Sequence, residues 1–204
     1  MRRKMAALVV SIATLGGAPA LAQERPGPGT VELSVIPGGG LFFVKSDQKS
    51  EPSFGNYDLG GAVAINFGRV GVEGEVAGSI GLTQTLEFAT SPAASTRTPN
   101  MLSYTGNVIV PLAPSGRRSM VPYAAAGLGG LTLFEKPAVG LIAGDTFFTG
   151  NAGGGLKWYA GRWGLRVDYR FVAVQSKDEA SSFFGRENRY GHRLYGGVIV
   201  NLVQ

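Results

Sequence analysis

The feature that most constrains this 204-residue chain is a strict two-residue alternation of apolar and polar side chains. It is clearest in residues 163–171, "WGLRVDYRF", where Trp, Leu, Val, Tyr and Phe alternate with Gly, Arg, Asp and Arg. This period is typical of a β-strand that presents one apolar face and one polar face. The alternation alone does not say which of the two faces meets the surroundings.

The same alternation recurs along the chain, and no convincing amphipathic helix follows Thr30. Four stretches share a glycine followed by alternating apolar residues, and the first three are each followed by a short turn and a further alternating segment. With one more segment near the N-terminus, they predict eight strands whose sequence neighbours are antiparallel. The predicted segments are 31–44, 60–67, 70–82, 105–112, 121–133, 153–160, 163–173 and 195–202.

The predicted connections alternate in length. Short turns are expected at 68–69, 113–119 and 161–162, and longer loops at 45–56, 84–100, 135–145 and 175–190. An even number of strands, with short turns on one side and long loops on the other, is typical of outer-membrane barrels. We therefore expect an all-β fold, an eight-stranded antiparallel up-and-down transmembrane β-barrel.

The N-terminal residues "MRRKMAALVVSIATLGGAPALAQ" have the three parts of a secretory signal peptide. A basic start precedes an apolar run over 5–15, which is shorter than the ~20 residues that a spanning helix needs. Ala20, Leu21 and Ala22 form an A-x-A cleavage site before Gln23. We expect a signal peptide at 1–22, a Pro/Gly-rich spacer at 23–29 and the barrel domain at 30–204.

Composition narrows the classes of partner. Removing three of the 19 basic residues with the signal peptide leaves 16 against 14 acidic ones, so the mature charge is close to neutral. No basic run with interleaved aromatic residues is present, and we expect no nucleic-acid partner. The absence of cysteine excludes disulfides and lipid attachment after a signal peptide.

The two faces of the predicted sheet differ in composition. One face is bulky, whereas the other is rich in Gly, Ala and Asn, which suit the narrow interior of an eight-stranded barrel. We assign Tyr123 to the bulky, lipid-facing side, and Ala124, Ala126 and Leu128 to the interior. Aromatic residues near strand ends favour interfacial girdles. The predicted girdle residues are Tyr57, Phe67, Tyr104, Trp158 and Trp163. Since the bulky face would also fill a core, a soluble periplasmic barrel that binds an apolar ligand is the first alternative.

Charged residues of the predicted interior concentrate on two strand pairs, and the strands that hold Glu73 and Arg166 lie opposite each other in an eight-stranded ring. Their charges sum to zero, and buried charges are generally paired. We expect an ion-pair network that closes the lumen; the alternatives are a gate and a carboxylate pair for acid–base catalysis. The predicted network consists of Glu73, Glu75, Lys157, Arg166, Asp168 and Arg170.

The chain resembles the OmpA-like outer-membrane β-barrel superfamily of Gram-negative bacteria, in particular its small stand-alone barrels. The stretches that support this are "VELSVIPGGGLFF", "YDLGGAVAINFG", "VPYAAAGLGG" and "NAGGGLKWYAGRWGLRVDYRF". The resemblance implies an outer-membrane location, periplasmic termini, insertion by the barrel-assembly machinery with periplasmic chaperones, and contact with lipids and lipopolysaccharide. It implies roles in envelope integrity or surface interaction, and no cofactor or metal. The chain ends in Gln204, whereas family chains commonly end in an aromatic residue.

An enzymatic role is the second alternative. Lipid A deacylases are barrels of similar size with a His and a Ser on one strand face. His192 is the one histidine of this chain, and Leu194 stands where such a serine would be expected. We therefore expect no enzymatic activity.

Overall fold

The structure is a computed structural model that describes residues 27–44, 52–88, 91–112, 119–139, 141, 143–177 and 187–203. The predicted signal peptide, its cleavage residues Ala22 and Gln23, and residues 24–26 of the predicted spacer lie outside the described residues.

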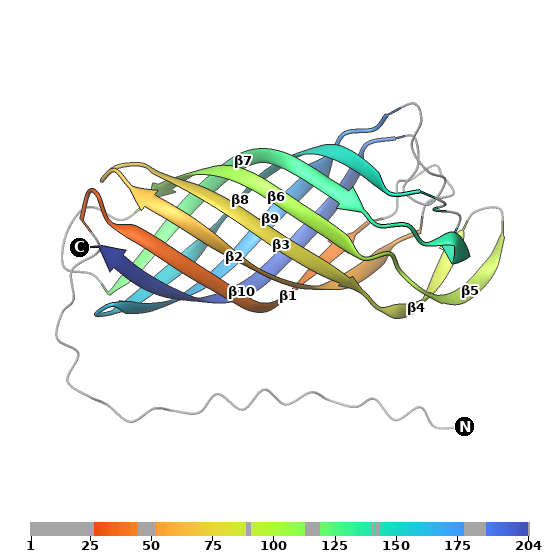
Figure 1. Cartoon of the computed structure of the whole chain (residues 1–204), viewed down its shortest axis with the longest axis horizontal. Helices are drawn as coiled ribbons and strands as arrows, with labels where there is room; N and C mark the ends of the chain where they lie inside the picture. The colour runs from red at the N-terminus through yellow and green to blue at the C-terminus, as the bar shows by residue number, and fades with distance from the viewer. Residues whose placement is uncertain are drawn as a thin grey trace, which may run out of the picture.

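Eight long antiparallel strands close into a barrel, which confirms the predicted fold class (Figure 1). The ring order is β1-β10-β9-β8-β7-β6-β3-β2, so β1 and β10 close the barrel. The strands have 11 to 16 residues, which meets the ~9–11 that a tilted strand needs to cross a bilayer. Their bounds are β1 Val31–Phe43, β2 Phe54–Asn66, β3 Gly71–Gly81, β6 Met101–Pro111, β7 Met120–Leu133, β8 Asp145–Ala160, β9 Trp163–Val174 and β10 Arg189–Val203.

The predicted loop at 84–100 contains a hairpin that the sequence did not indicate. β4 (Thr83–Phe88) and β5 (Ser91–Arg97) form a separate two-stranded sheet. This sheet extends beyond the end of the barrel that carries the long loops (Figure 1). A 3₁₀ turn, η1 (Pro137–Val139), lies in the next long loop. None of the helices in the described part of the chain is long and apolar enough to cross a membrane.

Two tight turns lie at the opposite end of the barrel, as predicted. Gly68 and Gly161 both adopt positive φ, 95° and 69°, a conformation that glycine tolerates without steric cost. In the first turn the Phe67 amide donates to the Val70 carbonyl at 2.8 Å. These turns join β2 to β3 and β8 to β9 with only a few residues.

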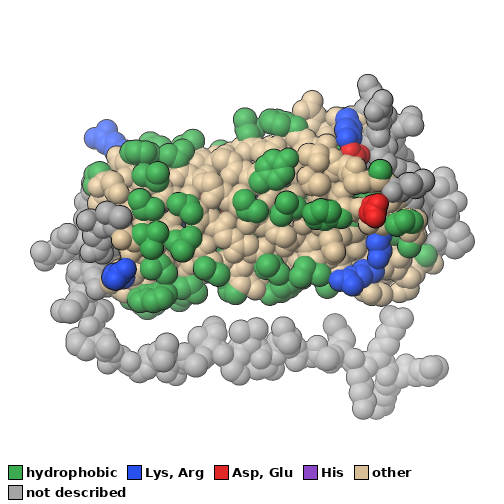
Figure 2. Space-filling model, viewed as in Figure 1, with side chains coloured by type: hydrophobic (Ala, Val, Ile, Leu, Met, Phe, Trp, Pro, Cys, Tyr) green, Lys and Arg blue, Asp and Glu red, His purple; other side chains and the backbone are tan. Residues whose placement is uncertain are grey.

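The outer wall is apolar along most of its length. Trp163 and Phe67 are each 61% exposed, and Val167 is 57% exposed. Figure 2 shows hydrophobic side chains over the barrel wall and charged side chains only toward its two ends. Large exposed apolar surfaces are rare on soluble monomers and mark contact with a partner or a membrane.

The predicted orientation of one strand was wrong. On β7, Tyr123 is only 2% exposed and lies inside the barrel, whereas Leu128 is 60% exposed and Ala126 faces outward. The prediction assumes that the two-residue alternation continues unchanged through the turn at 113–119. A shift of one residue in that turn exchanges the two faces of the strand that follows it. The outward positions of β7 carry small side chains, among them Ala124 and Ala126. The bulky Tyr123 lies on the inward face of this strand.

Candidate functional site in the barrel interior

The barrel interior contains many charged side chains. Among the residues that the structure describes, five acidic and five basic side chains are buried, so their formal charges cancel. Burying an isolated charge is costly unless it is paired and hydrogen-bonded. The buried charged residues are Glu32, Asp58, Glu73, Glu75, Lys157, Arg166, Asp168, Arg170, Arg189 and Arg193.

Arg166 connects opposite walls at the centre of this group. β9 and β3 stand four strands apart in the ring of eight, so the side chains of Arg166 and Glu73 meet across the lumen. Arg166 Nη1 lies 2.6 Å from Glu73 Oε2. Its Nε and Nη2 donate to the two Asp168 carboxylate oxygens at 2.7 and 3.0 Å, a bidentate arrangement that suits guanidinium geometry.

Two tyrosines complete the surroundings of Arg166. The ring centroids of Tyr123 and Tyr195 lie 5.9 and 5.6 Å from the guanidinium carbon, within the range of cation–π attraction. Both hydroxyl oxygens accept from Arg166 Nη2, at 3.2 and 3.4 Å. Arg166 therefore contacts two carboxylates and two aromatic rings.

Arg170 extends the group toward the long-loop end. Its Nη2 lies 2.8 Å from Asp168 Oδ1 and 3.7 Å from Glu73 Oε1. Asp168 therefore accepts from two arginines of its own strand. The structure thus brings four of the six predicted residues together: Glu73, Arg166, Asp168 and Arg170.

Glu75 has a partner other than the predicted arginines of β9. It pairs with Arg193 of β10 and accepts from the Tyr195 hydroxyl at 2.7 Å. Arg193 Nε also donates to Asp58 Oδ2 at 2.5 Å, and Ser79 donates to the same carboxylate at 2.8 Å. Asp58 and Arg193 were missing from the predicted network. Asp58 lies an even number of residues before the inward-facing Ala62 and Ala64 of the same strand. The two-residue alternation would therefore have indicated that its side chain points into the barrel.

Lys157 forms a separate pair near the short-turn end. It contacts Glu32 of β1, which also accepts from the Tyr159 hydroxyl at 2.6 Å. Glu32 was not predicted as a network residue either. The Lys157 ammonium lies 5.3 Å from the Tyr123 ring centroid, so that ring contacts both this pair and the guanidinium of Arg166.

Apolar side chains fill the barrel at the long-loop end. The cluster includes Leu86, a fully buried residue from the β4–β5 hairpin, so this hairpin is packed onto the barrel. Arg189 is buried beside it and donates to the Pro52 carbonyl at 2.8 Å. The apolar cap consists of Leu41, Phe43, Phe54, Leu86, Met101, Leu131, Leu133, Leu141, Phe147 and Val174.

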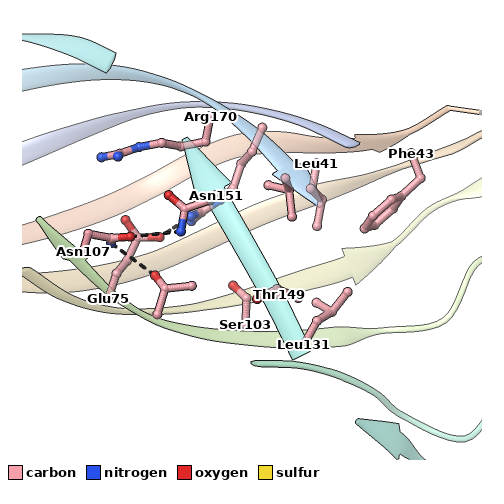
Figure 3. A pocket seen from close by; sticks show the side chains of 12 residues that line it. Leu41, Phe43, Glu75, Ser103, Asn107, Leu131, Thr149, Asn151 and Arg170 are labelled. Atoms are coloured by element: carbon pink, nitrogen blue, oxygen red, sulfur yellow. Dashed lines mark hydrogen bonds and ion pairs between the residues drawn. The ribbon is translucent and has the colours of Figure 1, made fainter. Parts of the chain in front are cut away.

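Two small cavities lie inside the described barrel. One cavity of about 30 Å³ lies between the apolar cap and the arginines, bordered by Leu41, Glu75 and Arg170 (Figure 3). A second of about 30 Å³ lies near Glu32 and Lys157. Ligand pockets of drug-sized molecules have volumes of about 300–1,000 Å³, so neither cavity accommodates such a molecule.

The predicted girdle residues all lie on the outer wall but at two different heights. Phe67, Trp158 and Trp163 are next to the tight turns, whereas Tyr57 and Tyr104 lie toward the long loops. On β9, the eight steps between Trp163 and Phe171 span about 20 Å along the barrel axis at ~3.3 Å per residue and ~40° tilt.

His192 contacts two aromatic side chains of β9. It lies on the outer face of β10, where its Nδ1 is 2.7 Å from the Tyr169 hydroxyl and its ring is 5.7 Å from that of Phe171. In the described part of the chain, no three metal-binding side chains gather into a candidate metal site.

Comparison with known proteins shows similarity at the level of structure. No family model matches the chain, and no curated protein matches it. The crystal structure of Neisserial surface protein A (NspA) is 12% identical, with a TM-score of 0.56, and the match covers 85% of this chain and 96% of that one.

Two further structures are similar at lower scores. Ail, the attachment invasion locus protein of Yersinia pestis, is 15% identical over 84% of this chain and 99% of that chain, with a TM-score of 0.49. The outer membrane protein OprG of Pseudomonas aeruginosa is 12% identical over 87% and 99%, also at 0.49. At 12% identity, the likeness to Neisserial surface protein A shows the barrel fold alone.

Proposed function

We propose that this chain is an integral outer-membrane β-barrel of the OmpA-like type, with a structural or surface-interaction role in the envelope and a closed lumen. The observation that supports this most strongly is the inverted distribution of polarity. Charged side chains such as Arg166 and Asp168 are buried, whereas Trp163 and Val167 of the same strand are exposed. Transmembrane barrels alternate apolar-out and polar-in along each strand.

The interior argues against the soluble alternative. A soluble barrel that carries an apolar ligand needs an apolar chamber, and this barrel instead holds ion pairs around Arg166 and Arg193. Neither of the two cavities of about 30 Å³ described above has room for such a ligand. The exposed aromatic residues at the two heights are favourable where the wall meets lipid headgroups.

In this proposal two groups of side chains, one after the other along the barrel axis, close the lumen. The Arg166 group crosses the barrel, and the apolar cap fills the end with the long loops. Water and ions would have to displace ion pairs and an apolar cluster to pass. We therefore propose that the protein does not act as an open pore or as a gate.

The surface role is assigned to the long-loop end. Outer-membrane barrels place their longer loops outside the cell and their short turns in the periplasm. The β4–β5 hairpin extends from this end and has exposed residues at Thr83, Thr85 and Glu87. Proposed partners are outer-membrane lipids and lipopolysaccharide at the wall, and the assembly machinery and periplasmic chaperones during insertion.

The proposal excludes catalysis by the interior carboxylates, because Glu73 and Glu75 are both held in ion pairs and hydrogen bonds. A lipid A-modifying activity is not proposed, since Leu194 follows His192 on the outer face where a serine would be needed. Mass profiles of lipid A from a deletion strain and its parent should be identical. A difference restored by the plasmid-borne gene would contradict this part of the proposal.

Membrane fractionation tests the location. The mature protein should remain in the outer-membrane fraction after alkaline or urea washes, and should migrate differently in detergent gels before and after boiling. An unboiled sample of a folded barrel keeps its compact form. Release with the soluble periplasmic fraction would contradict the proposal.

A further inference from the structure

The outer wall of the barrel is hollowed over β7 and β8. A groove of about 650 Å³ lies on this part of the wall, between β6 on one side and β9 on the other. The strand register aligns its outward residues in two rows across the four strands. The lower row is Val108, Ala126, Ala152 and Phe171, and the row nearer the long loops is Gly106, Leu128, Gly150 and Ala173.

Small side chains form the floor of this groove. Ala126 and Ala152 are direct partners in the β7–β8 register, and both face outward. Larger exposed side chains flank them, Val108 on β6 and Phe171 on β9. The groove is therefore two strands wide, or about 10 Å at the ~4.8 Å spacing of neighbouring strands.

A second hollow continues the groove toward the long loops. It has a volume of about 450 Å³ and shares Gly150 and Ala173 with the groove. Its lining includes the polar side chains of Gln175, Ser176 and Asn188, and no charged residue. Asn188 Oδ1 accepts from the Ser176 amide at 2.8 Å, which ties the end of β9 to the segment before β10. The combined surface thus changes from apolar to polar and uncharged along the barrel axis.

The change in polarity occurs at a height that matches a bilayer boundary. The eleven steps of β9 from Trp163 to Val174 span about 28 Å along the axis at ~3.3 Å per residue and ~40° tilt. The hydrocarbon core of a bilayer is ~30 Å thick. With Trp163 at one interface, the apolar groove lies in the half of the core nearer the long loops, and Gln175 lies where the ester groups of lipids begin.

The shape of the groove distinguishes between two possible occupants. A second barrel presents a convex wall of similar curvature, which cannot enter a hollow two strands wide. A fatty-acyl chain is narrow and flexible enough to follow the floor past Ala152 and Gly150. The amide and hydroxyl groups above it can donate to the ester oxygens at the head of that chain.

We propose that this groove binds one acylated lipid of the leaflet on the long-loop side. One acyl chain lies over Ala126 and Ala152, and its ester group meets Gln175, Ser176 and Asn188. Since no charged residue lines the polar hollow, the site reads the chain and its ester group rather than the headgroup charge. This inference rests on the proposed membrane location and adds a specific lipid site to it.

Native mass spectrometry of the refolded mature protein in detergent micelles tests the site, with phosphatidylcholine as the probe. One tightly bound lipid per barrel is expected. Ala126→Phe combined with Ala152→Phe fills the floor and should weaken binding at least about tenfold, or ~1.4 kcal/mol. Ala152→Phe alone should give a smaller loss.

The control is Gly74→Phe, which adds the same ring to the outer wall outside the groove. Gly74 is the register partner of Gly106 on the neighbouring strand, and a Cβ at position 74 would meet no atom within 4 Å. This variant should bind lipid as the unmodified protein does. Equal affinity of the double variant and the control, or dimers in place of lipid-bound monomers, would overturn the inference.

Two further measurements separate the lipid site from the membrane location. Phosphatidylglycerol and phosphatidylcholine should bind equally, and a tenfold preference for the anionic lipid would contradict an uncharged contact. All variants should keep the heat-dependent mobility of a folded barrel. Loss of neither lipid nor mobility in the double variant would refute the site alone, whereas release of the protein with the soluble periplasmic fraction would refute the location.

Discussion

Arg166 on β9 and Glu73 on β3 form an ion pair, 2.6 Å between Nη1 and Oε2, across the lumen of the barrel. Both side chains are completely shielded from solvent. Neighbouring strands of the barrel are joined by the backbone ladder, and this contact adds a direct side-chain link between opposite walls. We propose that this link braces the two walls against each other.

Replacing Arg166 should destabilise the barrel strongly. Arg166→Met leaves Glu73 and Asp168 without their principal cationic partner, and breaking a buried pair from one side costs about 3–5 kcal/mol. The free energy of unfolding in urea, measured in detergent or liposomes, should fall by about that amount. Arg69→Met, at an exposed residue of a tight turn, is the control and should change little.

A double-mutant cycle separates the coupling energy between Arg166 and Glu73 from the general disruption that each substitution causes. Glu73→Gln in the Arg166→Met background should recover part of the loss, because it removes an uncompensated buried charge. Strictly additive effects of the two substitutions would show that the two side chains are not energetically coupled, and would contradict the cross-bracing role.

The proposed closure of the lumen predicts that the protein does not conduct. In planar bilayers the purified barrel should show no sustained single-channel steps, because ion pairs and the apolar cap occupy the cross-section. Replacing Arg166, Arg170 and Arg193 together by Ala should open a water-filled path on the short-turn side of the cap and increase the frequency of transient steps. Sustained conductance of the unmodified protein would be incompatible with closure.

The β4–β5 hairpin should contribute to stability through Leu86, which is fully buried in the apolar cap. Leu86→Ala removes buried apolar volume, and such truncations cost about 2–5 kcal/mol. Thr85→Ala, at the exposed neighbouring position, is the matched control. If chemical unfolding shows the same midpoint for both variants, Leu86 does not hold the hairpin against the barrel.

The sequence predicted the barrel because its strands alternate strictly and its connections alternate in length. It also placed Glu73, Arg166, Asp168 and Arg170 on facing walls, since strand order fixes which strands are opposite. The parity of β7 could not be carried through residues 113–119, because turn length sets the phase of the next strand. With alanines on its outer face, β7 offered no bulky side to correct the error.

The remaining differences between predicted and observed contacts arise from the place of each strand in the ring as well as from the face of the strand. Glu75 pairs with Arg193 of β10, a strand that stands three places from β3 in the ring, whereas β9 stands four places away. Lys157 likewise pairs with Glu32 from β1. The β4–β5 hairpin was missed because its strands are short and contain small polar residues, which are common in loops.

The most direct test of the account measures which face of β9 meets lipid. Because the chain contains no cysteine, a single nitroxide label can be attached at Val167→Cys and compared with one at Thr85→Cys on the exposed hairpin. In reconstituted liposomes, the label at position 167 should be accessible to oxygen and protected from a water-soluble nickel chelate, and the label at position 85 should show the reverse. Chelate access at position 167 equal to that at position 85 would place this face in water and contradict the membrane-spanning barrel.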